Sequence, residues 1–407
     1  MSDQASLLLV THVPIHVGAG RMRIDDQTAA GIAQWSRHFD RVTYYGIRTR
    51  GDAVEGSSTN WVEADGDALG GNVTVRALPW GYRPAEMLRH VRPVAGELSA
   101  AIDRHRHLCF TLGGMIGDWP SLAAWQAARK GRRYAAWIDR VEGEVIHAKV
   151  AGSRAGRLAA AALVPGMEAG LRYLLRHSSV ALLQGGDTFG HFRDAAPDPH
   201  CTYDTHTHAH EAIDATALAT KQARARSGAA LRIVYVGRAA AMKGPFDWLA
   251  AIERLHGLGV PLHARWIGDG PDLPAMRAIV AAKGLGAVVD LPGYEGRRDV
   301  LLQAMRDADL LLFAHKSSES ARCLIEALVC GCPIVGYDGG YPRGLVAAQG
   351  GGRFVPPHDA AALADAVAVL HADRGALAAT IGAAAASGAD FTEDRVYAHR
   401  AALMRRG

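Results

Sequence analysis

The sequence of 407 residues has few cysteines, few aromatic residues, little net charge and no long apolar run. Its five cysteines are an odd number, and the spacing of Cys330 and Cys332 matches neither a disulfide framework nor a set of zinc ligands. No window approaches the roughly 18 consecutive apolar residues of a transmembrane helix. A net charge of +4 gives no support for nucleic-acid binding. The number and spacing of the cysteines favour a protein of a reducing compartment.

The amino terminus resembles no secretion signal, because the apolar run Leu7–Val10 is too short and follows polar residues. We therefore expect a cytoplasmic protein. Peripheral contact with the inner face of a membrane is the alternative, since Val150–His177 combines apolar residues with four arginines. Pro165-Gly166 interrupts this stretch, which predicts one broken helix or two. It is either a basic surface for an anionic membrane or lipid-linked ligand, or an ordinary helix with one face on the core.

Short β-type runs alternate with Ala- and Leu-rich helical stretches along the whole chain, which is typical of α/β proteins with parallel sheets. The chain length predicts two domains. The expected strands form two series: Leu7–Val10, Val42–Tyr45, Val73–Leu78, Leu108–Thr111, Tyr134–Ile138 and Val180–Leu183, then Arg232–Val236, His263–Ile267, Val288–Leu291, Leu310–Phe313, Ile334–Val335 and Gly352–Val355. Two such series predict two Rossmann-like units.

A polar, His-rich stretch from Cys201 to Asp214 lies between the two series, and an Ala-, Lys- and Arg-rich segment follows it to Ser227. We interpret this region as the crossover between domains. The expected domains are residues 1–214 and 215–390, followed by a terminal segment, 391–407.

Cationic residues follow the first strand of the second series. Arg232–Val236 ends in Gly237-Arg238, and Lys243-Gly244 comes five residues later. Ligands bind at the carboxyl edge of parallel sheets. There, a guanidinium and an ammonium can neutralise a diphosphate and stabilise it as a leaving group. The alternative for both is an ordinary surface charge.

Two glycine turns follow the next strands, at Gly268-Asp269-Gly270-Pro271 and at Leu291-Pro292-Gly293-Tyr294. Such turns let a flat base lie against the backbone, or they are simple connections between strand and helix.

The segment from Ser317 to Pro333 follows the strand Leu310–Phe313 and is the most informative part of the sequence about ligand binding. Its leading Ser and Glu residues can cap a helix whose first amides would face an anion. These amides belong to Ala321, Arg322, Cys323 and Leu324. Glu326 lies about two turns inside, where a carboxylate can accept both hydroxyls of a ribose, and its apolar neighbours disfavour a solvated role.

The Gly-Arg and Lys-Gly pairs, the Gly-Asp-Gly-Pro turn and the run Glu-Ala-Leu-Val-Cys-Gly-Cys-Pro-Ile-Val together resemble the retaining GT-B glycosyltransferases of family 4, over roughly residues 231–370. The resemblance implies an α/β fold of two Rossmann-like domains that face each other across a cleft. It implies a nucleotide-diphosphate sugar donor and neither a cofactor nor a metal. Carried over position by position, the resemblance implies that Arg238 and Lys243 hold the diphosphate and that Glu326 holds the ribose. It also implies that Gly268, Gly293 and Tyr294 lie in the donor site. The segment 391–407 resembles the helix that crosses back to the first domain.

The sequence departs from the family motif at one position. The motif has a first Glu, seven residues and a second Glu, which places the first position at Ser318, whereas Glu319 comes one place late. The family's first Glu contacts the transferred sugar. We therefore expect Ser318 or Glu319 to replace it, and the sugar is left open.

The first half offers further candidates. After its opening strand, His12, Pro14, His16, Gly18 and Gly20 resemble the family's N-terminal glycine loop, so Gly18 and Gly20 are expected under the donor phosphates, or else in a flexible turn from strand to helix. After the strand Tyr134–Ile138, where the family often has a catalytic His, this chain has Asp139. We predict a catalytic Asp139, with a buried structural Asp as the alternative. Asp187 is a candidate on the acceptor side.

Three alternating histidines, His206, His208 and His210, would share one face of a strand, but a metal would also need a fourth ligand. We expect no metal.

The sequence thus predicts transfer of a sugar to the hydroxyl of a glycan, a lipid-linked or a small-molecule acceptor, with Arg238, Lys243, Asp139 and Glu319 as catalytic residues. A sugar-nucleotide epimerase and a catalytically silent binding protein are the alternatives. The base, the acceptor and the oligomeric state are open.

Overall fold

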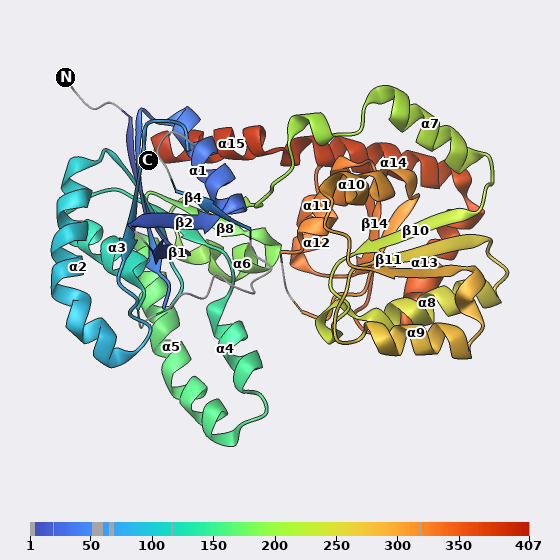
Figure 1. Cartoon of the computed structure of the whole chain (residues 1–407), viewed down its shortest axis with the longest axis horizontal. Helices are drawn as coiled ribbons and strands as arrows, with labels where there is room; N and C mark the ends of the chain where they lie inside the picture. The colour runs from blue at the N-terminus through green and yellow to red at the C-terminus, as the bar shows by residue number, and fades with distance from the viewer. Residues whose placement is uncertain are drawn as a thin grey trace. The chain divides into compact units, whose positions relative to one another are not determined.

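The computed structural model of the chain describes residues 5–18, 20–50, 60–64, 69–114, 117–317 and 320–406 (Figure 1). Ser318 and Glu319 lie outside these residues. The contacts divide the chain into two compact units. Unit 1 consists of Met1–Thr202 and Val396–Gly407, and unit 2 of Tyr203–Arg395.

Unit 1 is built on a sheet whose parallel strands lie in the order β5-β3-β1-β6-β7-β8-β9. A short antiparallel ribbon, β2 and β4, extends the far end of β1. The strands are β1 (Ser6–Gly18), β2 (Arg21–Asp25), β3 (Arg41–Arg48), β4 (Trp61–Glu63), β5 (Val73–Leu78), β6 (His107–Thr111), β7 (Ala135–Ile138), β8 (Val180–Gln184) and β9 (Pro199–Thr202). The helices are α1 (Asp26–His38), α2 (Pro84–Arg104), α3 (Trp119–Arg129), α4 (Glu142–Val150), α5 (Arg154–His177), α6 (Gly185–Phe192) and most of α15 (Glu393–Arg406).

Unit 2 contains a six-stranded sheet, entirely parallel, in the order β12-β11-β10-β13-β14-β15. Its strands are β10 (Leu231–Val236), β11 (Leu262–Ile267), β12 (Val289–Gly293), β13 (Leu310–Phe313), β14 (Ile334–Tyr337) and β15 (Gly352–Val355). Its helices are α7 (Ala215–Arg226), α8 (Pro245–Gly257), α9 (Leu273–Ala282), α10 (Arg298–Asp307), α11 (Arg322–Val329), α12 (Gly340–Leu345), α13 (Ala360–Ala372) and α14 (Arg374–Gly388).

The sequence predicted both sheets correctly, since each expected strand overlaps an observed one. Strands such as β8, β13 and β14 are buried along their whole length. Parallel strands covered on both faces need apolar residues at successive positions rather than at alternate ones, and such runs are easily recognised. The predicted α/β fold with two Rossmann-like units is confirmed.

The opening strand is longer than expected. β1 changes register between Val10 and Pro14 and continues to Gly18, which lies opposite Arg21 of β2 in an antiparallel hairpin. Gly20 has φ +75°, a conformation that favours glycine in a tight hairpin turn. The expected turn from strand to helix at Gly18 and Gly20 is therefore wrong, because alternating residues after Pro14 extend the strand.

The break in the stretch 150–177 also differs from the prediction. Helix α4 ends at Val150, and α5 begins after Ser153, whose hydroxyl accepts the amide of Gly156 at 3.1 Å. Pro165 lies inside α5 without ending it. Pro165 is exposed and has no amide hydrogen to donate, so the helix carbonyl that would accept that hydrogen can bond to water instead.

The contacts place the boundary between the units at Thr202 and Tyr203, before the expected boundary at residue 215. The intervening residues pack on unit 2, because the amide of Ile213 donates to the Val329 carbonyl at 2.9 Å and Arg306 donates to the Glu211 carbonyl at 2.7 Å. Helix α7, expected in the crossover, packs against α14. The last helix, α15, starts in unit 2 and contributes Val396 onward to unit 1.

Candidate functional site

The order of strands in unit 2 creates a natural ligand site. From β10, the chain proceeds to β11 and β12 on one side and later to β13, β14 and β15 on the other. The loops after β10 and β13 therefore leave the sheet in opposite directions. In open parallel sheets, ligands bind in the crevice that opens at this switch point.

Gly244, in the loop after β10, is the point at which the two loops touch. It adopts the left-handed conformation, with φ 64° and ψ 45°, directly before Pro245 at the first position of α8. A Cβ atom on Gly244 would lie 2.1 Å from the carbonyl oxygen of Ala314, which follows β13. The amide of Lys316 donates to the Met242 carbonyl at 2.8 Å. The sequence Lys243-Gly244-Pro245 therefore holds Lys243 beside the loop after β13.

His315 lies beside Lys243, in the loop after β13. Its Nε2 atom lies 2.8 Å from the hydroxyl of Tyr235 on β10. Burial lowers the pKa of His315 to about 3, with a further contribution from the positive charge of Lys243. The imidazole is therefore neutral at neutral pH. The sequence analysis did not identify His315, although its position directly after a buried strand at the carboxyl edge was a usable signal.

Arg238 lies in the loop after β10, which is joined by backbone hydrogen bonds to the loop after β11 and, through it, to the end of β12. The amide of Ala239 donates to the Asp269 carbonyl at 2.9 Å, and the amide of Gly268 donates to the Gly293 carbonyl at 2.8 Å. A Cβ atom on Gly268 would lie 2.0 Å from the Gly237 carbonyl oxygen, so the turn needs glycine. The predicted residues Arg238, Gly268 and Gly293 are thus brought together, and Tyr294 beside them is exposed.

The cations at this edge differ in their partners. Lys316 forms an ion pair with Asp247 at 2.8 Å, and Asp247 also accepts the Tyr337 hydroxyl at 2.7 Å. Arg238 is exposed and forms no ion pair with any residue of the described ranges. An anionic ligand at this edge can therefore pair with Arg238 without displacing an internal carboxylate.

Helix α11 begins at Arg322 after Ala321, which is buried at the N-cap position. Of the four predicted amides, that of Leu324 already donates to the Ala321 carbonyl at 3.1 Å. Arg322 is exposed and Cys323 half-buried. The predicted residues Ser318 and Glu319 lie outside the described part of this loop.

Glu326 is not a solvated residue, since its side chain is only 19% exposed and its Oε1 atom lies 2.6 Å from Nη1 of Arg298. Arg298 also forms two hydrogen bonds with Glu211, at 2.7 and 2.9 Å. Two carboxylates therefore fix one guanidinium, and one oxygen of Glu326 is already engaged. Sequence reasoning missed Arg298 and Glu211, because tertiary contacts alone bring them to Glu326.

The candidates of unit 1 lie at the carboxyl edge of its own sheet. Asp139 follows β7 and is exposed, so the alternative of a buried structural Asp is wrong. Asp187 is half-buried in the first turn of α6. One further pair was not predicted: Nε2 of His12 lies 3.3 Å from Oδ1 of Asp118.

The three alternating histidines do not form a strand. Only Thr207 makes a bridge, with Thr392, and a short 3-10 helix begins at Ala209. His206 and His208 lie 3.6 and 3.2 Å from the buried carboxylate of Glu393. Within the described ranges, no group of three or more His, Cys, Asp or Glu side chains could hold a metal ion.

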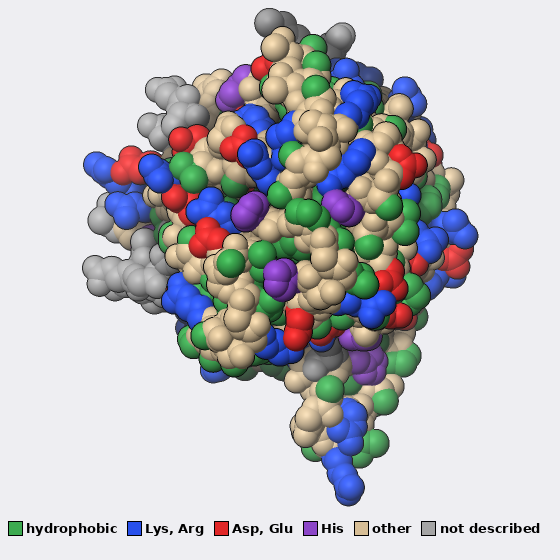
Figure 2. Space-filling view, turned by 90° about the vertical axis from the view of Figure 1, so that its right-hand side faces the viewer, with side chains coloured by type: hydrophobic (Ala, Val, Ile, Leu, Met, Phe, Trp, Pro, Cys, Tyr) green, Lys and Arg blue, Asp and Glu red, His purple; other side chains and the backbone are tan. Residues whose placement is uncertain are grey.

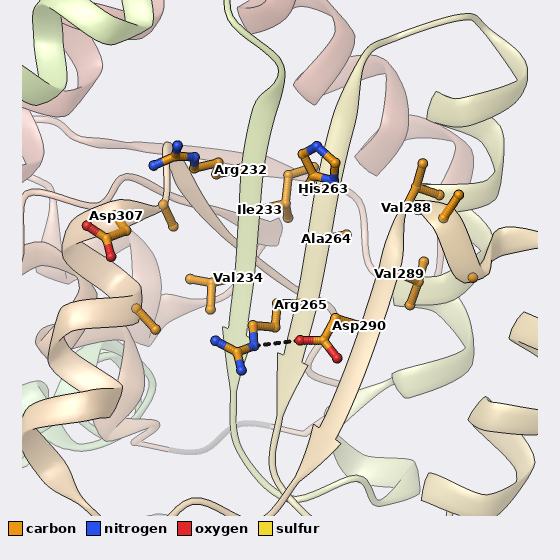
Figure 3. Close-up of a pocket in the computed structure, with 14 residues that line it drawn as sticks. Arg232, Ile233, Val234, His263, Ala264, Arg265, Val288, Val289, Asp290 and Asp307 are labelled. Carbon is orange, nitrogen blue, oxygen red and sulfur yellow. Dashed lines mark ion pairs between the residues drawn. The ribbon is translucent and has the colours of Figure 1, made fainter.

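A separate hollow of about 360 Å³ lies on one face of β10, β11 and β12 (Figure 3). Arg265 and Asp290 form an ion pair of 2.8 Å on this face, near Arg232 and His263. None of the predicted donor residues lines the hollow. It therefore lies apart from the carboxyl-edge site.

The chain matches known proteins mainly through unit 2. The model of the family "Glycosyl transferases group 1" matches residues 219–387. Over 144 residues, the chain is 35% identical to the 2-deoxystreptamine N-acetyl-D-glucosaminyltransferase of Streptomyces fradiae, covering 34% of each chain. Over 147 residues, it is 34% identical to the D-inositol 3-phosphate glycosyltransferase of Mycobacteroides abscessus, covering 35% of this chain and 32% of that protein. These matches span about a third of the length of the curated relatives.

A solved structure extends the likeness to the whole chain. The Anabaena protein HepE in complex with UDP has a TM-score of 0.63 and 15% identity, covering 98% of both chains. At this identity, the likeness shows the fold alone. The whole chain therefore has the GT-B fold, and its residues 219–387 match the glycosyl transferases group 1 family.

Proposed function

We propose that the protein is a retaining glycosyltransferase, which moves a sugar from a nucleotide-diphosphate sugar to the hydroxyl of a glycan, lipid-linked or small-molecule acceptor. The observation that carries this proposal is the corner formed by Lys243, Gly244 and His315 at the switch point of unit 2. A departing diphosphate gains negative charge, and fixed cations beside it lower the barrier.

In the proposed donor complex, Arg238 and Lys243 hold the diphosphate, together with the first amides of α11 at Arg322 and Cys323. The oxygen of Glu326 that does not contact Arg298 accepts the ribose hydroxyls. The base lies against Gly268, Gly293 and Tyr294. UDP is the first nucleotide to test, since structures of HepE hold UDP and UDP-glucose.

Neither a metal nor a cofactor is required in this proposal, because the two cationic side chains supply the charge that a metal would otherwise provide. The acceptor attacks the anomeric carbon on the face that the diphosphate leaves, as the resemblance to the retaining enzymes implies. Asp139 is proposed for the acceptor side, and Ser318 or Glu319 for contact with the transferred sugar.

A catalytically silent sugar-nucleotide binding protein is the second candidate. The displaced acidic residue at Ser318 and Glu319 favours it, because the position that should meet the sugar is altered. Consumption of a bound donor separates the two functions. Binding of UDP-sugar without release of UDP, with any acceptor, would establish the silent protein.

We further propose peripheral contact with an anionic membrane at the cytoplasmic face, through the hairpin of α4 and α5 that projects from the rest of unit 1 (Figure 1). Leu158 and Leu163 are 74% and 65% exposed. Residues 145–167 contain Lys149, Arg154 and Arg157 but no Asp or Glu. In Figure 2, the tip at the bottom of the view carries cationic and hydrophobic side chains.

The two halves of α5 differ in their surroundings. Met167, Leu171 and Leu175, in the second half, are buried in the core, which fits the ordinary core-facing helix. In the first half, only Ala160 is buried before Val164. Among the described residues, α5 is the one helix long and apolar enough to cross a membrane, by length and composition only, and a third of its apolar window is buried. Contact along the surface fits the cationic first half.

A thermal-shift screen of UDP-, GDP-, ADP- and TDP-sugars tests donor binding, since a ligand that binds the folded state raises the melting temperature. We expect Arg238→Ala and Lys243→Ala to abolish transfer while leaving the melting temperature of the free protein unchanged. Lys283→Ala is the matched control, because Lys283 pairs with Glu253 after α9, outside the donor loops. Turnover of both variants at the level of the control would refute the assignment.

A further inference from the structure

Glu326 is held by a guanidinium and not by solvent alone. It lies in the second turn of α11 among buried residues, and Arg298, the first residue of α10, reaches it from the neighbouring helix. Nη1 of Arg298 donates to Oε1 of Glu326 at 2.6 Å. The other oxygen, Oε2, forms no hydrogen bond within the part of the chain that the structure describes. The carboxylate therefore has one fixed oxygen and one available oxygen.

Arg298 is itself fixed by Glu211. The guanidinium forms two parallel bonds with this carboxylate, from Nε to Oε1 at 2.7 Å and from Nη2 to Oε2 at 2.9 Å. Nη2 also donates to the His206 carbonyl at 3.1 Å. With the bond to Glu326, these contacts engage most of the N–H groups that a guanidinium has. A bidentate pair of this kind fixes the plane of the guanidinium, so Arg298 cannot turn away from Glu326 without breaking it.

Glu211 has a fixed position of its own. Its Oε2 atom accepts the amide of His208 at 2.8 Å, and its backbone carbonyl accepts Nη2 of Arg306 at 2.7 Å. Burial raises the pKa of Glu211, but the hydrogen bonds from Arg298 and from the His208 amide outweigh it and hold the pKa below its ordinary value. The carboxylate is therefore ionised at neutral pH, and it holds Arg298 in place before any ligand binds.

A carboxylate fixed in this way can accept a hydroxyl at a small entropic cost. A free glutamate side chain loses rotational freedom when it binds a ligand, and this loss lowers affinity. The bond to Arg298 has already removed that freedom from Glu326 in the folded protein. The oxygen that remains available has two lone pairs, which suit two hydroxyls on neighbouring carbons of a ribose.

We propose that Arg298, held by Glu211, is a positioning residue that fixes Glu326 for the ribose hydroxyls and so makes the donor site selective for ribonucleoside diphosphates. This proposal rests on the donor binding of the proposed function. A purely structural ion pair between α10 and α11 is the alternative. It would contribute to the stability of unit 2, but it would not distinguish nucleotides that differ only in their ribose hydroxyls.

Calorimetry with two forms of one nucleotide separates these roles. The full-length protein is titrated with UDP, GDP and ADP, and the nucleotide that binds most tightly is compared with its 2′,3′-dideoxy form, which lacks both ribose hydroxyls. The unaltered protein should bind the ribose form at least about tenfold more tightly, because this is the affinity that a hydrogen bond to a charged group contributes.

Arg298→Lys keeps the positive charge but cannot form the fork that joins Glu211 to Glu326. We expect it to weaken binding of the ribose form by about two- to tenfold, which is the affinity that one newly ordered side chain costs. Binding of the dideoxy form should stay unchanged. The double variant Glu211→Gln with Arg298→Met should give the same pattern. It removes both partners together, so Glu211 does not remain as an unpaired buried charge if the single variant fails to fold.

Arg224→Lys is the matched control, because Arg224 also pairs with a buried carboxylate of unit 2, that of Asp309, whose side chain is 1% exposed. Asp309 directly precedes β13, so this pair lies at the amino ends of the strands, away from the carboxyl-edge site. The control should leave the affinities for both nucleotide forms unchanged.

The proposal is overturned if Arg298→Lys binds both forms as the unaltered protein does, weakens both equally, or binds the ribose form more tightly. Equal binding of the two forms by the unaltered protein would also overturn it. If none of the three nucleotides binds, donor binding itself fails, and the role of Arg298 fails with it. If the expected pattern appears but no sugar-nucleotide is consumed with any acceptor, the transferase activity fails and the positioning of Glu326 stands.

Discussion

Replacing Gly244 by alanine tests whether contact between the loops after β10 and β13 shapes the donor site. Two costs follow from the structure. An alanine at φ +64° costs about 1–2 kcal/mol in the left-handed region. Its Cβ atom would lie 2.1 Å from the Ala314 carbonyl oxygen, and real Cβ contacts stay beyond 3.0 Å. The loops must therefore move apart by roughly 1 Å, and such overpacking costs about 1–3 kcal/mol.

Gly284 supplies an unusually close control. It has the same φ of +64°, lies in the same unit, and has no atom within 4 Å of an added Cβ. We expect Gly284→Ala to lower the free energy of unfolding by about 1–2 kcal/mol and Gly244→Ala by about 2–5 kcal/mol. Urea unfolding compares the same transition in both. Only Gly244→Ala should weaken UDP binding by calorimetry, since it displaces Lys243 and His315.

Equal losses of stability in the two variants, with unchanged UDP affinity, would show that the Gly244 contact neither constrains the loops nor positions the cations. A larger loss of stability in Gly244→Ala without a loss of UDP affinity would confirm the contact between the loops but contradict its role in donor binding. The diphosphate site would then lie elsewhere.

Two further predictions concern pH and the membrane. Because the pKa of His315 is about 3 when folded and about 6.5 when unfolded, acidification from pH 6.5 favours the unfolded chain, by up to about 2 kcal/mol at pH 5. His315→Gln should remove this part of the pH dependence in urea unfolding at pH 7 and pH 5, and equal pH slopes in both proteins would contradict the assignment. Replacing Leu158 and Leu163 by Asp should weaken binding to phosphatidylglycerol vesicles at least tenfold in a sedimentation assay, since a buried leucine contributes about 1.5–3 kcal/mol. Leu88→Asp is the control, because Leu88 is equally exposed, at 76%, but lies on α2; an equal loss there would exclude a specific role for the hairpin.

The sequence predicted those features that depend on neighbouring residues. Buried parallel strands appear as apolar runs. The glycines at positions 244 and 268 mark turns where the backbone leaves no space for a side chain, and Gly293 has a φ of +91°, which favours glycine. The placement of Arg238 and Lys243 at one sheet edge followed from the same rule, because the carboxyl ends of parallel strands share an edge.

Features that depend on distant contacts could not be predicted. Arg298 is recognisable as a site residue only once it joins Glu211 to Glu326. The position of His315 after β13 was a usable signal, but only the structure shows that Tyr235 and Lys243 lie beside it. The observed domain boundary, between Thr202 and Tyr203, differs from the expected one at residue 215 for the same reason. A polar, His-rich stretch is typical of a linker, yet the chain from Tyr203 packs on unit 2 through backbone hydrogen bonds that composition does not reveal.

The switch point of unit 2 carries Lys243 beside a neutral imidazole, which suits a departing anion in the proposed donor complex. In the proposed retaining reaction, the diphosphate leaves from the face that the acceptor attacks, so it can accept the proton of the acceptor hydroxyl. The anomeric configuration of the product, determined by NMR, therefore tests retention. An inverted product would overturn the retaining mechanism and would leave donor binding by Arg238 and Lys243 in place.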